Sequence, residues 1–384
     1  MLTISSIDYA FSLVIFLIGW VICNRIGQKI KLNFQRLSLI YIWHSIFCCI
    51  YINYLLNFGG DSVYYYLSSQ ISQITPSFGT EGIIYLTGIL STYFNLGFVP
   101  INFVFNIFGS LGLLFFDAAI KNTSKNTSRQ NFLLSTIIFL PSLSYWSSAL
   151  GKDSLAFLSV GMLLWSMQKI RQRRISLFFS IIIMFFVRPH IAFIMIAALM
   201  ASIIITKKIG LLSRFIIFAL AGISGYLLLP IVADYTGYGR ALNASVLREF
   251  IETRAQSSSL GGSAVNLSNM SPPLRVLNYA FRPTLLEARS ITYLISAIDN
   301  LIISWIFLYL VLSSIFSTQK RSQGINNTTF LYAYIAVMWM VLGMTTANLG
   351  IAQRQKWMFM PALIILYAEY QLRITRNRKK QVIL

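Results

Sequence analysis

Residues 101–120 read INFVFNIFGSLGLLFFDAAI, and residues 121–129 directly after them read KNTSKNTSR. An apolar run of this length, folded as an α-helix, crosses a hydrocarbon layer about 30 Å thick. Its residues do not alternate between polar and apolar, as the strands of outer-membrane barrels do. A short segment that carries Lys and Arg but no acid is typical of a cytoplasmic loop. This stretch therefore predicts a helix that spans a membrane and ends on the cytoplasmic side.

The same pattern recurs along the chain. Hydrophobic residues make up 56% of its 384 residues and charged residues 11%, and the mean hydropathy is +0.68. A soluble protein of this length carries more charge on its surface. We therefore predict an all-α, polytopic transmembrane helical bundle of about 11–12 spans. The predicted spans are 7–23, 37–57, 101–120, 131–149, 154–168, 175–187, 190–206, 212–232, 293–316, 328–346 and 357–372.

The net charge of +20 is distributed unevenly along the chain. Six connecting segments hold 21 of the 31 Lys and Arg residues and no acid, whereas the other ten share their segments with nine of the eleven acids. The two sets alternate, which predicts that the basic segments are cytoplasmic and the mixed-charge segments face outward. A nucleic-acid-binding protein would instead collect its basic residues on a soluble domain, so no nucleic acid is expected as a partner. The basic segments are 25–36, 121–129, 169–174, 207–214, 320–321 and 373–380.

The topology before residue 121 has two alternatives. Keeping 58–81 outside and 121–129 inside requires an odd number of crossings between them, yet two apolar blocks lie there, 82–98 and 101–120. The first block contains Thr, Ser, Asn and three Gly, so we favour an interfacial or re-entrant helix there, with eleven crossings and an outside N-terminus. The alternative is twelve crossings with both termini inside, which places the four charges of 25–36 outside.

Residues 233–291 form a long external segment. They contain a predicted amphipathic helix near 239–256 and then the stretch SSSLGGSAVNLSNMSPP, which is rich in Ser and Gly. A segment of this length is more than a connector. The predicted organisation is thus an N-terminal transmembrane bundle (1–232), a periplasmic loop (233–291), and C-terminal transmembrane helices with a basic cytoplasmic tail (292–384).

Two groups of polar residues interrupt the first predicted spans on the outer side, where charge at membrane depth is costly. Gly59-Gly60-Asp61 precedes three tyrosines, so Asp61 is a candidate general base, and Tyr64 and Tyr65 are candidates to stack on sugar rings. Lys152 and Asp153 precede a helix that is short for a full span, so we expect both to lie recessed in a cavity. The alternative interpretations are a turn with an interfacial aromatic belt, and a helix cap with a structural ion pair.

Arg188-Pro189-His190 lies between two apolar runs. An Arg at such a place is tolerated where it faces a polar cavity or an anion, which makes Arg188 a candidate catalytic residue and His190 a candidate for substrate binding. The other histidine, His44, lies inside an apolar helix and is expected to be a hydrogen-bonded core residue. The three cysteines lie in or beside apolar segments and indicate neither a disulfide nor a metal site.

Two further groups occur in the C-terminal half of the chain. The first surrounds Phe281-Arg282-Pro283, and the second follows the motif Asn348-x-Gly350. Gly and Pro around paired cations indicate a backbone that bends towards an anionic group. The alternative is that these side chains anchor the chain on lipid phosphates. The residues predicted to bind substrate are Arg282, Glu287, Arg289, Arg354 and Lys356.

The chain contains no Walker loop, no zinc signature and only two histidines. ATP hydrolysis and metal ligation by His are therefore not expected, and neither a cofactor nor a metal is predicted. The outer residues instead combine many Arg and Lys with a few carboxylates and aromatic side chains. This combination suits a diphosphate leaving group held by guanidinium groups, with a carboxylate that deprotonates a hydroxyl.

These motifs resemble those of the Wzy-type O-antigen and capsule repeat-unit polymerases, the polytopic membrane proteins of bacterial polysaccharide clusters. The resemblance spans most of the chain as a pattern of short motifs. Relatives often carry Arg where Lys356 stands, and Lys keeps the charge but not the two-pronged contact. The motifs are Gly59-Gly60-Asp61 before the Tyr run, Trp146-Ser-Ser with Gly151-Lys152-Asp153, Arg188-Pro189-His190, Phe281-Arg282-Pro283, and Asn348-x-Gly350 before Arg354-x-Lys356.

The resemblance implies a GT-C-like glycosyltransferase of the bacterial inner membrane that uses no cofactor. Its implied substrate is an undecaprenyl-diphosphate-linked oligosaccharide, and its implied partners are membrane lipids and a chain-length regulator. The growing chain passes, in this scheme, from its lipid diphosphate to the non-reducing end of a new repeat on the periplasmic side. The implied roles are diphosphate binding by Lys152, Arg188, Arg282 and Arg354, base catalysis by Asp61 or Asp153, and a glycan path along Tyr64 to Tyr66.

Two other classes of protein remain open. One is a polyprenyl-phosphate-sugar transferase that adds a single branch sugar and uses Asp61 as the acidic residue of its first loop. The other is a transporter of lipid-linked oligosaccharides. The chain has no obvious inverted repeats and carries a large external loop, which argues against a transporter.

Overall fold

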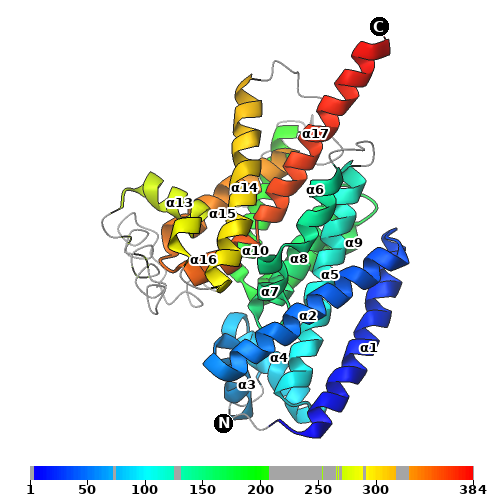
Figure 1. Ribbon diagram of the computed structural model, residues 1–384, viewed down its shortest axis with the longest axis vertical. Helices are drawn as coiled ribbons and strands as arrows, with labels where there is room; N and C mark the ends of the chain where they lie inside the picture. The colour runs from blue at the N-terminus through cyan, green and yellow to red at the C-terminus, as the bar shows by residue number, and fades with distance from the viewer. Residues whose placement is uncertain are drawn as a thin grey trace. The chain divides into compact units, whose positions relative to one another are not determined.

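The structure is a computed structural model that describes residues 4–71, 75–124, 131–206, 270–288, 291–316 and 328–383, with Thr253, Val265 and Leu267. Every regular element in these residues is a helix (Figure 1). The chain divides into two compact units, and each is described by itself. Unit 1 is Met1–Pro189 with Ala368–Leu384, and unit 2 is His190–Tyr367.

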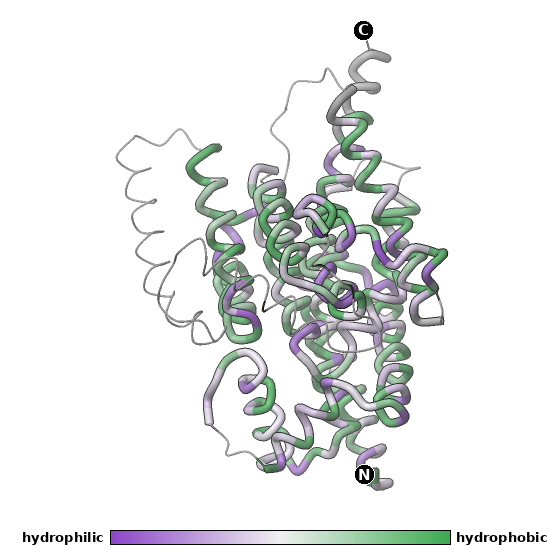
Figure 2. Tube along the Cα trace, turned by 90° about the vertical axis from the view of Figure 1, so that its left-hand side faces the viewer, coloured by the Kyte–Doolittle hydropathy of each residue, from purple (hydrophilic) through white to green (hydrophobic). Residues whose placement is uncertain are grey.

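Five helices in the described part of the chain are long and apolar enough to cross a membrane. Figure 2 shows hydrophobic residues, in green, along much of the helical trace. The all-helical class is therefore confirmed for the described residues, and these five helices have the length and composition of membrane spans. The five are α1 (Ser6–Lys29), α2 (Phe34–Phe58), α5 (Phe98–Ser124), α14 (Ile291–Phe316) and α15 (Thr328–Thr345).

α5 is the central helix of unit 1, and most of its side chains are buried. α1, α2 and α8 (Lys152–Met167) all pack on it. α5 and α8 approach each other closely where Gly112 meets Gly161, because a Cβ at Gly161 would lie 2.3 Å from the Gly112 carbonyl oxygen. Small residues at such crossings let two membrane helices approach to backbone contact.

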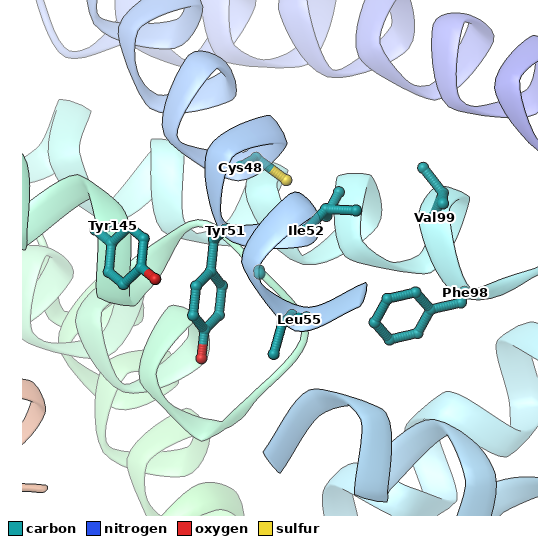
Figure 3. Packing of buried hydrophobic residues seen from close by; sticks show 8 residues of the cluster. Cys48, Tyr51, Ile52, Leu55, Phe98, Val99 and Tyr145 are labelled. Carbon is teal, nitrogen blue, oxygen red and sulfur yellow. The ribbon is translucent and has the colours of Figure 1, made fainter. Parts of the chain in front are cut away.

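A cluster of buried side chains joins α2, α5 and α7 (Pro141–Ser147) at one end of unit 1 (Figure 3). Leu55, near the end of α2, and Phe98, at the start of α5, both belong to this cluster. The end of α2 therefore packs against the start of α5. At the other end, Arg36 in the first turn of α2 donates from Nε to Asp117 Oδ2 at 2.8 Å and from Nη2 to Asp117 Oδ1 at 2.5 Å. α2 therefore runs antiparallel to α5.

α1 and α8 run in the same direction as α5. Asp8 in the first turn of α1 lies against the glycine just before α5. Leu150, just before α8, donates its amide to Asn102 Oδ1 in the first turns of α5 at 2.9 Å. Gln168, just after α8, donates from Nε2 to the carbonyl of Ala119 near the end of α5 at 2.7 Å. The starts of α1, α5 and α8 thus lie together.

The charged residues of unit 1 separate into two ends. Asp117, whose side chain is 1% exposed, pairs with Arg36 and lies 3.7 Å from Lys121 Nζ, and we call this the basic end. The predicted basic segment 169–174 follows α8 and so begins at the same end, where Arg173 stacks on Trp165. The starts of α5 and α8 mark the opposite end, which we call the site end.

Two parts of unit 1 differ from the sequence prediction. The predicted span 131–149 is broken into α6 (Asn131–Thr136), the 3₁₀ turn η1 (Ile137–Phe139) and α7, because Pro141 has no N–H and begins a new helix. α3 (Asp61–Ile71) is a helix that the pattern does not predict, since its polar and Tyr-rich sequence contains no apolar run.

α4 (Gly79–Tyr93) occupies most of the block 82–98 and contains 15 residues. A helix of that length rises about 22 Å, which is short of the ~30 Å hydrocarbon layer. This length agrees with the interfacial or re-entrant alternative, and the number of crossings stays a prediction. α9 (Arg174–Val187) also belongs to unit 1 and packs on α8.

In unit 2, α13 (Pro272–Phe281) packs on α15 and α14. Trp339 of α15 donates its indole N–H to the Val276 carbonyl at 2.9 Å, and its ring meets Phe281 and Phe307 edge to face. The short helix α16 (Leu349–Lys356) begins at Asn348, whose side chain accepts hydrogen bonds from two amides of the first turn. The other described elements are α10 (Pro189–Thr206), η2 (Leu285–Glu287) and α17 (Met360–Ile383).

Several predictions fall outside the described residues. These are the span 212–232, the amphipathic helix near 239–256 apart from Thr253, the basic segments 207–214 and 320–321, and Arg289. The division into 1–232, 233–291 and 292–384 follows topology across a membrane and stays a prediction.

Candidate functional site

The site end of unit 1 is built around the start of α8. Asp153 lies in the first turn of this helix, where a carboxylate interacts favourably with the helix dipole. Arg188 directly follows α9, and its Nη2 lies 2.5 Å from Asp153 Oδ1. The side chains of Arg188 and Asp153 are 12% and 18% exposed. The two predicted groups around Asp153 and Arg188 therefore meet in a recessed ion pair.

α8 and α9 bring this pair together. Ser159 of α8 donates from Oγ to the carbonyl of Ser180 of α9 at 2.6 Å, in the middle of both helices. The Arg188 guanidinium is not saturated by the pair, because its buried Nε has no hydrogen-bond partner among the described residues. A guanidinium carries five N–H donors, so the pair with Asp153 leaves donors of Arg188 for a further acceptor.

Lys152 and Asp153 are adjacent in the sequence but have different partners. Its Nζ donates to Thr80 Oγ1 of α4 at 2.6 Å. The structural ion pair considered for this segment is thus made by Asp153 with Arg188 and not by Asp153 with Lys152. Two cations, Lys152 and Arg188, consequently lie at the site end together with Asp153.

α3 carries the group that contains Asp61, and a single backbone position ties it to the start of α8. Ser62 Oγ donates to the Leu150 carbonyl at 2.5 Å, while the Leu150 amide donates to Asn102. The turn before α3 requires glycine, since Gly59 and Gly60 have φ of 73° and 145°. The groups around Asp61, Lys152 and Arg188 are therefore all at the site end.

The residues of α3 differ in exposure. Asp61 is exposed, as is Tyr64 at 55%, so both are accessible at the site end. Tyr65 is 7% exposed and packs in a core cluster with Leu150 and Val187. This position suits packing of α3 and not stacking on sugar rings, which leaves Tyr64 as the aromatic candidate.

In unit 2, Arg282 and Glu287 form a second ion pair. Arg282 donates from Nε to Glu287 Oε1 at 2.6 Å, and Nη2 lies 2.5 Å from the same oxygen. Glu287 also accepts from the Thr284 amide at 2.8 Å, which caps η2. The hydrogen bond from Arg282 lowers the pKa of Glu287 below its usual value. Both side chains are about one third exposed, at 30% and 31%.

Lys356 lies beneath this pair and is 2% exposed. Its Nζ donates to the carbonyl of Arg282 at 2.7 Å and to Asn300 Oδ1 at 3.0 Å. Asn300 in turn donates to the Pro283 carbonyl at 3.1 Å. Lys356 is outside the spans, and burial lowers its pKa to about 7. This geometry fits a residue that holds the Arg282 backbone, and it differs from the direct substrate contact that the sequence suggests.

The neighbours of Lys356 on α16 also hold this helix in place. Gln353 accepts from Ser296 Oγ at 2.9 Å, and Gln355 accepts from Thr346 Oγ1 at 2.8 Å. Arg354 between them is partly buried. The groups around Arg282 and Arg354 are therefore brought together in unit 2 through Lys356.

The two histidines occupy different environments. His44 is fully buried in α2, with Nδ1 2.6 Å from Asn106 Oδ1 and Nε2 3.0 Å from Ser147 Oγ, so the expected core role is confirmed. His190 is partly buried at the start of α10 and belongs to unit 2, whereas Arg188 belongs to unit 1.

Thr80 and Asn102 are site residues that sequence reasoning misses. Asn102 is a polar residue inside an apolar run, which is a signal, while Thr80 lies in a polar segment and carries none. Among the described residues, no group of three His, Cys, Asp or Glu could hold a metal ion. No protein-family model, no curated protein and no solved structure matches this chain.

Proposed function

We propose that this chain is a membrane glycosyltransferase that joins undecaprenyl-diphosphate-linked oligosaccharide repeats into O-antigen or capsular polysaccharide. The reaction takes place on the periplasmic face of a bacterial inner membrane. The observation that carries the proposal is the assembly of Asp61, Lys152, Asp153 and Arg188 at the site end of unit 1. The Arg36–Asp117 pair and Lys121 lie at the opposite, basic end.

The proposed reaction forms a glycosidic bond and releases a lipid diphosphate. An acceptor hydroxyl attacks the anomeric carbon, the bond from that carbon to the diphosphate oxygen breaks, and a carboxylate takes the hydroxyl proton. Arg188 and Lys152 stabilise the negative charge that develops on the departing diphosphate. Asp61 is exposed, whereas the Asp153 side chain is only 18% exposed, so the greater access of an acceptor hydroxyl to Asp61 favours Asp61 as the base.

The direction of the helices supports the orientation. α1 and α5 run in the same direction, as an outside N-terminus with eleven crossings requires. With twelve crossings the two helices would run in opposite directions. The eleven-crossing topology therefore places the basic end in the cytoplasm and the site end on the periplasmic side, in agreement with the positive-inside rule.

Unit 2 contains a second group of cationic side chains. Arg282 presents a guanidinium that is 30% exposed, and Lys356 and Glu287 hold its backbone and side chain. Arg354 on α16 is the other cation of this group. We assign Arg282 and Arg354 to binding of anionic groups of the substrate, within a GT-C-like architecture.

Deletion of the gene, followed by gel analysis of the surface polysaccharide, tests the function. Loss of a polymerase collapses the ladder of chain lengths to a single repeat on its lipid core. Loss of a branch-sugar transferase keeps the ladder but shifts its band spacing, and loss of a transporter abolishes even the single repeat. A full ladder of unchanged spacing in the deletion strain would refute the proposed polymerase.

A further inference from the structure

An apolar groove of about 530 Å³ lies between α1, α2 and α5 of unit 1. Its volume falls within the range of about 300–1,000 Å³ that is usual for sites that bind small molecules. All three helices are candidate membrane spans, and if they span the membrane the groove lies at the depth of its hydrocarbon layer. It is lined by Tyr9, Ser12, Leu13, Phe16, Ile42, Ser45, Ile46, Cys49, Ile52, Asn53, Leu56, Val99 and Phe103.

The groove opens sideways between α1 and α2. Leu13 of α1 is 60% exposed, and Ile42 and Ile46 of α2 are 45% and 48% exposed, whereas Val99 on α5 is buried at 5%. α5 thus forms its floor, and the rims face outward from the bundle. Apolar surface of this kind at membrane depth is covered by hydrocarbon and not by water.

The hydroxyl groups inside the groove are already used by the protein. Ser12 donates to the Asp8 carbonyl at 2.7 Å, and Ser45 donates to the Tyr41 carbonyl at 2.8 Å. Ser45 also accepts from Asn106 Nδ2 at 2.8 Å. The body of the groove therefore offers a ligand apolar contact without demanding hydrogen bonds, which suits a hydrocarbon chain.

One end of the groove has a polar mouth. Tyr9 and Asn53 line this end and are exposed, and Asp8 precedes Tyr9 at the site end of unit 1. Among α1, α2 and α5, Asp8 is the one acid at the site end, and its Oδ2 accepts from the Ser5 amide at 2.8 Å and from Ser5 Oγ at 3.1 Å. Residues 1–24 and 37–120 contain no Lys or Arg. A diphosphate head group would find no cation on these helices, whereas an amine would be attracted by Asp8.

We propose that this groove is a binding site for one acyl chain of a phospholipid whose head group carries an amine, with phosphatidylethanolamine as the probe. The acyl chain lies along α5, and the ammonium group lies at the mouth near Asp8. The site is distinct from that of the lipid-linked sugar substrate, and the inference does not depend on the proposed glycosyl transfer.

Cys49 provides a probe of occupancy. It lines the groove and is the exposed thiol of the chain, while Cys23 and Cys48 are buried. The experiment measures the rate of Cys49 alkylation by N-ethylmaleimide in the purified full chain, in detergent micelles that contain one added lipid. Phosphatidylethanolamine at ten times its Kd is expected to slow alkylation about tenfold. Phosphatidylglycerol and a polyprenyl diphosphate are expected to leave the rate nearly unchanged.

Three variants define the measurement. Cys49→Ser removes the labelled thiol and should abolish alkylation. Asp8→Asn should reduce protection by phosphatidylethanolamine about threefold, because an exposed ion pair makes a modest contribution. Glu81→Gln removes an exposed acid at the start of α4, away from the groove lining, and should keep the protection of the wild type.

Four results would overturn the proposal. Absence of protection by phosphatidylethanolamine shows that no such site exists. Equal protection by phosphatidylglycerol shows that the amine is not recognised, and protection by the polyprenyl diphosphate alone shows that the groove holds the substrate chain. If Asp8→Asn does not fold, the lipids that copurify with the wild-type chain decide the matter. They should be enriched in phosphatidylethanolamine over the host membrane, and the absence of enrichment refutes the site.

Discussion

Arg188 Nη2 lies 2.5 Å from Asp153 Oδ1, although the two residues are 35 positions apart in the sequence. The pair closes the gap between the end of α9 and the start of α8, and both side chains are largely buried. A buried pair of this kind leaves an uncompensated charge when one partner is removed. A substitution at either residue therefore has to be separated into an effect on folding and an effect on turnover.

Arg188→Lys makes this separation. The Lys side chain keeps the positive charge next to Asp153 but cannot hold a carboxylate and a second anion in the planar fork of an Arg. We expect normal expression and insertion of Arg188→Lys, and a fall in polymerisation rate on the order of 10²-fold, as for loss of one donor to a developing oxyanion. The measurement is the polysaccharide ladder of the complemented deletion strain, together with the amount of protein in the membrane.

Arg36→Lys is the matched control for Arg188→Lys. Arg36 also forms an ion pair with a buried carboxylate, Asp117, but at the basic end of unit 1. Arg36→Lys is expected to leave the ladder unchanged for an equal amount of protein. A wild-type ladder for Arg188→Lys as well would assign Arg188 a purely structural role.

The parallel direction of α1 and α5 predicts the position of the first loop. Asn33, which caps α2, lies at the basic end beside Arg36. A cysteine at position 33 should therefore not react with a membrane-impermeant maleimide in intact spheroplasts, and neither should one at Asn126. A cysteine at Ser258 in the predicted external loop should react. Labelling at position 33 would show that the chain crosses the membrane twelve times and not eleven.

Arg354 is expected to act in turnover and not in folding. It lies on α16, outside the candidate spans, next to the residues that hold Arg282. Arg354→Ala should express and insert normally but lose long polysaccharide chains, with a rate loss on the order of 10²–10³. Arg354→Lys should recover only part of the activity, because an ammonium group cannot make a two-pronged contact.

Arg275→Lys serves as the control for Arg354→Lys. Arg275 is a partly buried Arg of α13 that donates from Nε to the Met270 carbonyl at 3.1 Å, and it belongs to none of the site groups. Its substitution is expected to leave chain length unchanged. If Arg354→Lys gives a full ladder, Arg354 anchors the chain on lipid and does not bind the substrate.

The sequence predicts the class of fold and the two ends of unit 1, because both depend on where apolar and charged residues occur along the chain. It does not predict which side chains pair. Lys152 and Asp153 are neighbours in sequence, yet they contact Thr80 and Arg188. Successive residues of a helix point in directions about 100° apart, so adjacent charges face different helices.

Other differences depend on burial, which a list of residue types does not reveal. Tyr64 and Tyr65 look equivalent in the sequence, but the helical period of α3 exposes the first and buries the second. The sequence predicts that Lys356 binds the substrate, but in the structure its Nζ donates to the Arg282 carbonyl and to Asn300 Oδ1. These contacts join residues that are 56 and 74 positions apart, beyond the reach of local patterns.

Lys356 provides the last prediction, because its burial makes the stability of the chain depend on pH. Burial lowers its pKa to about 7, whereas a Lys in an unfolded chain has a pKa of about 10.4. Between these two values the unfolded chain binds more protons than the folded chain. The free energy of unfolding therefore rises with pH across this window, by at most about 5 kcal/mol for the full difference.

The contribution of Lys356 is accordingly expected to raise the apparent Tm of the full chain in detergent from about pH 7 upward. Lys356→Met replaces the Lys side chain with an apolar side chain of similar length and removes the titrating group. The rise in Tm with pH should therefore be smaller than in the wild type. Lys29→Met, at an exposed position in the last turn of α1, should retain the slope of the wild type. If Lys356→Met keeps the slope as well, Lys356 is charged in the folded chain and regains its predicted role as a cation that binds the substrate.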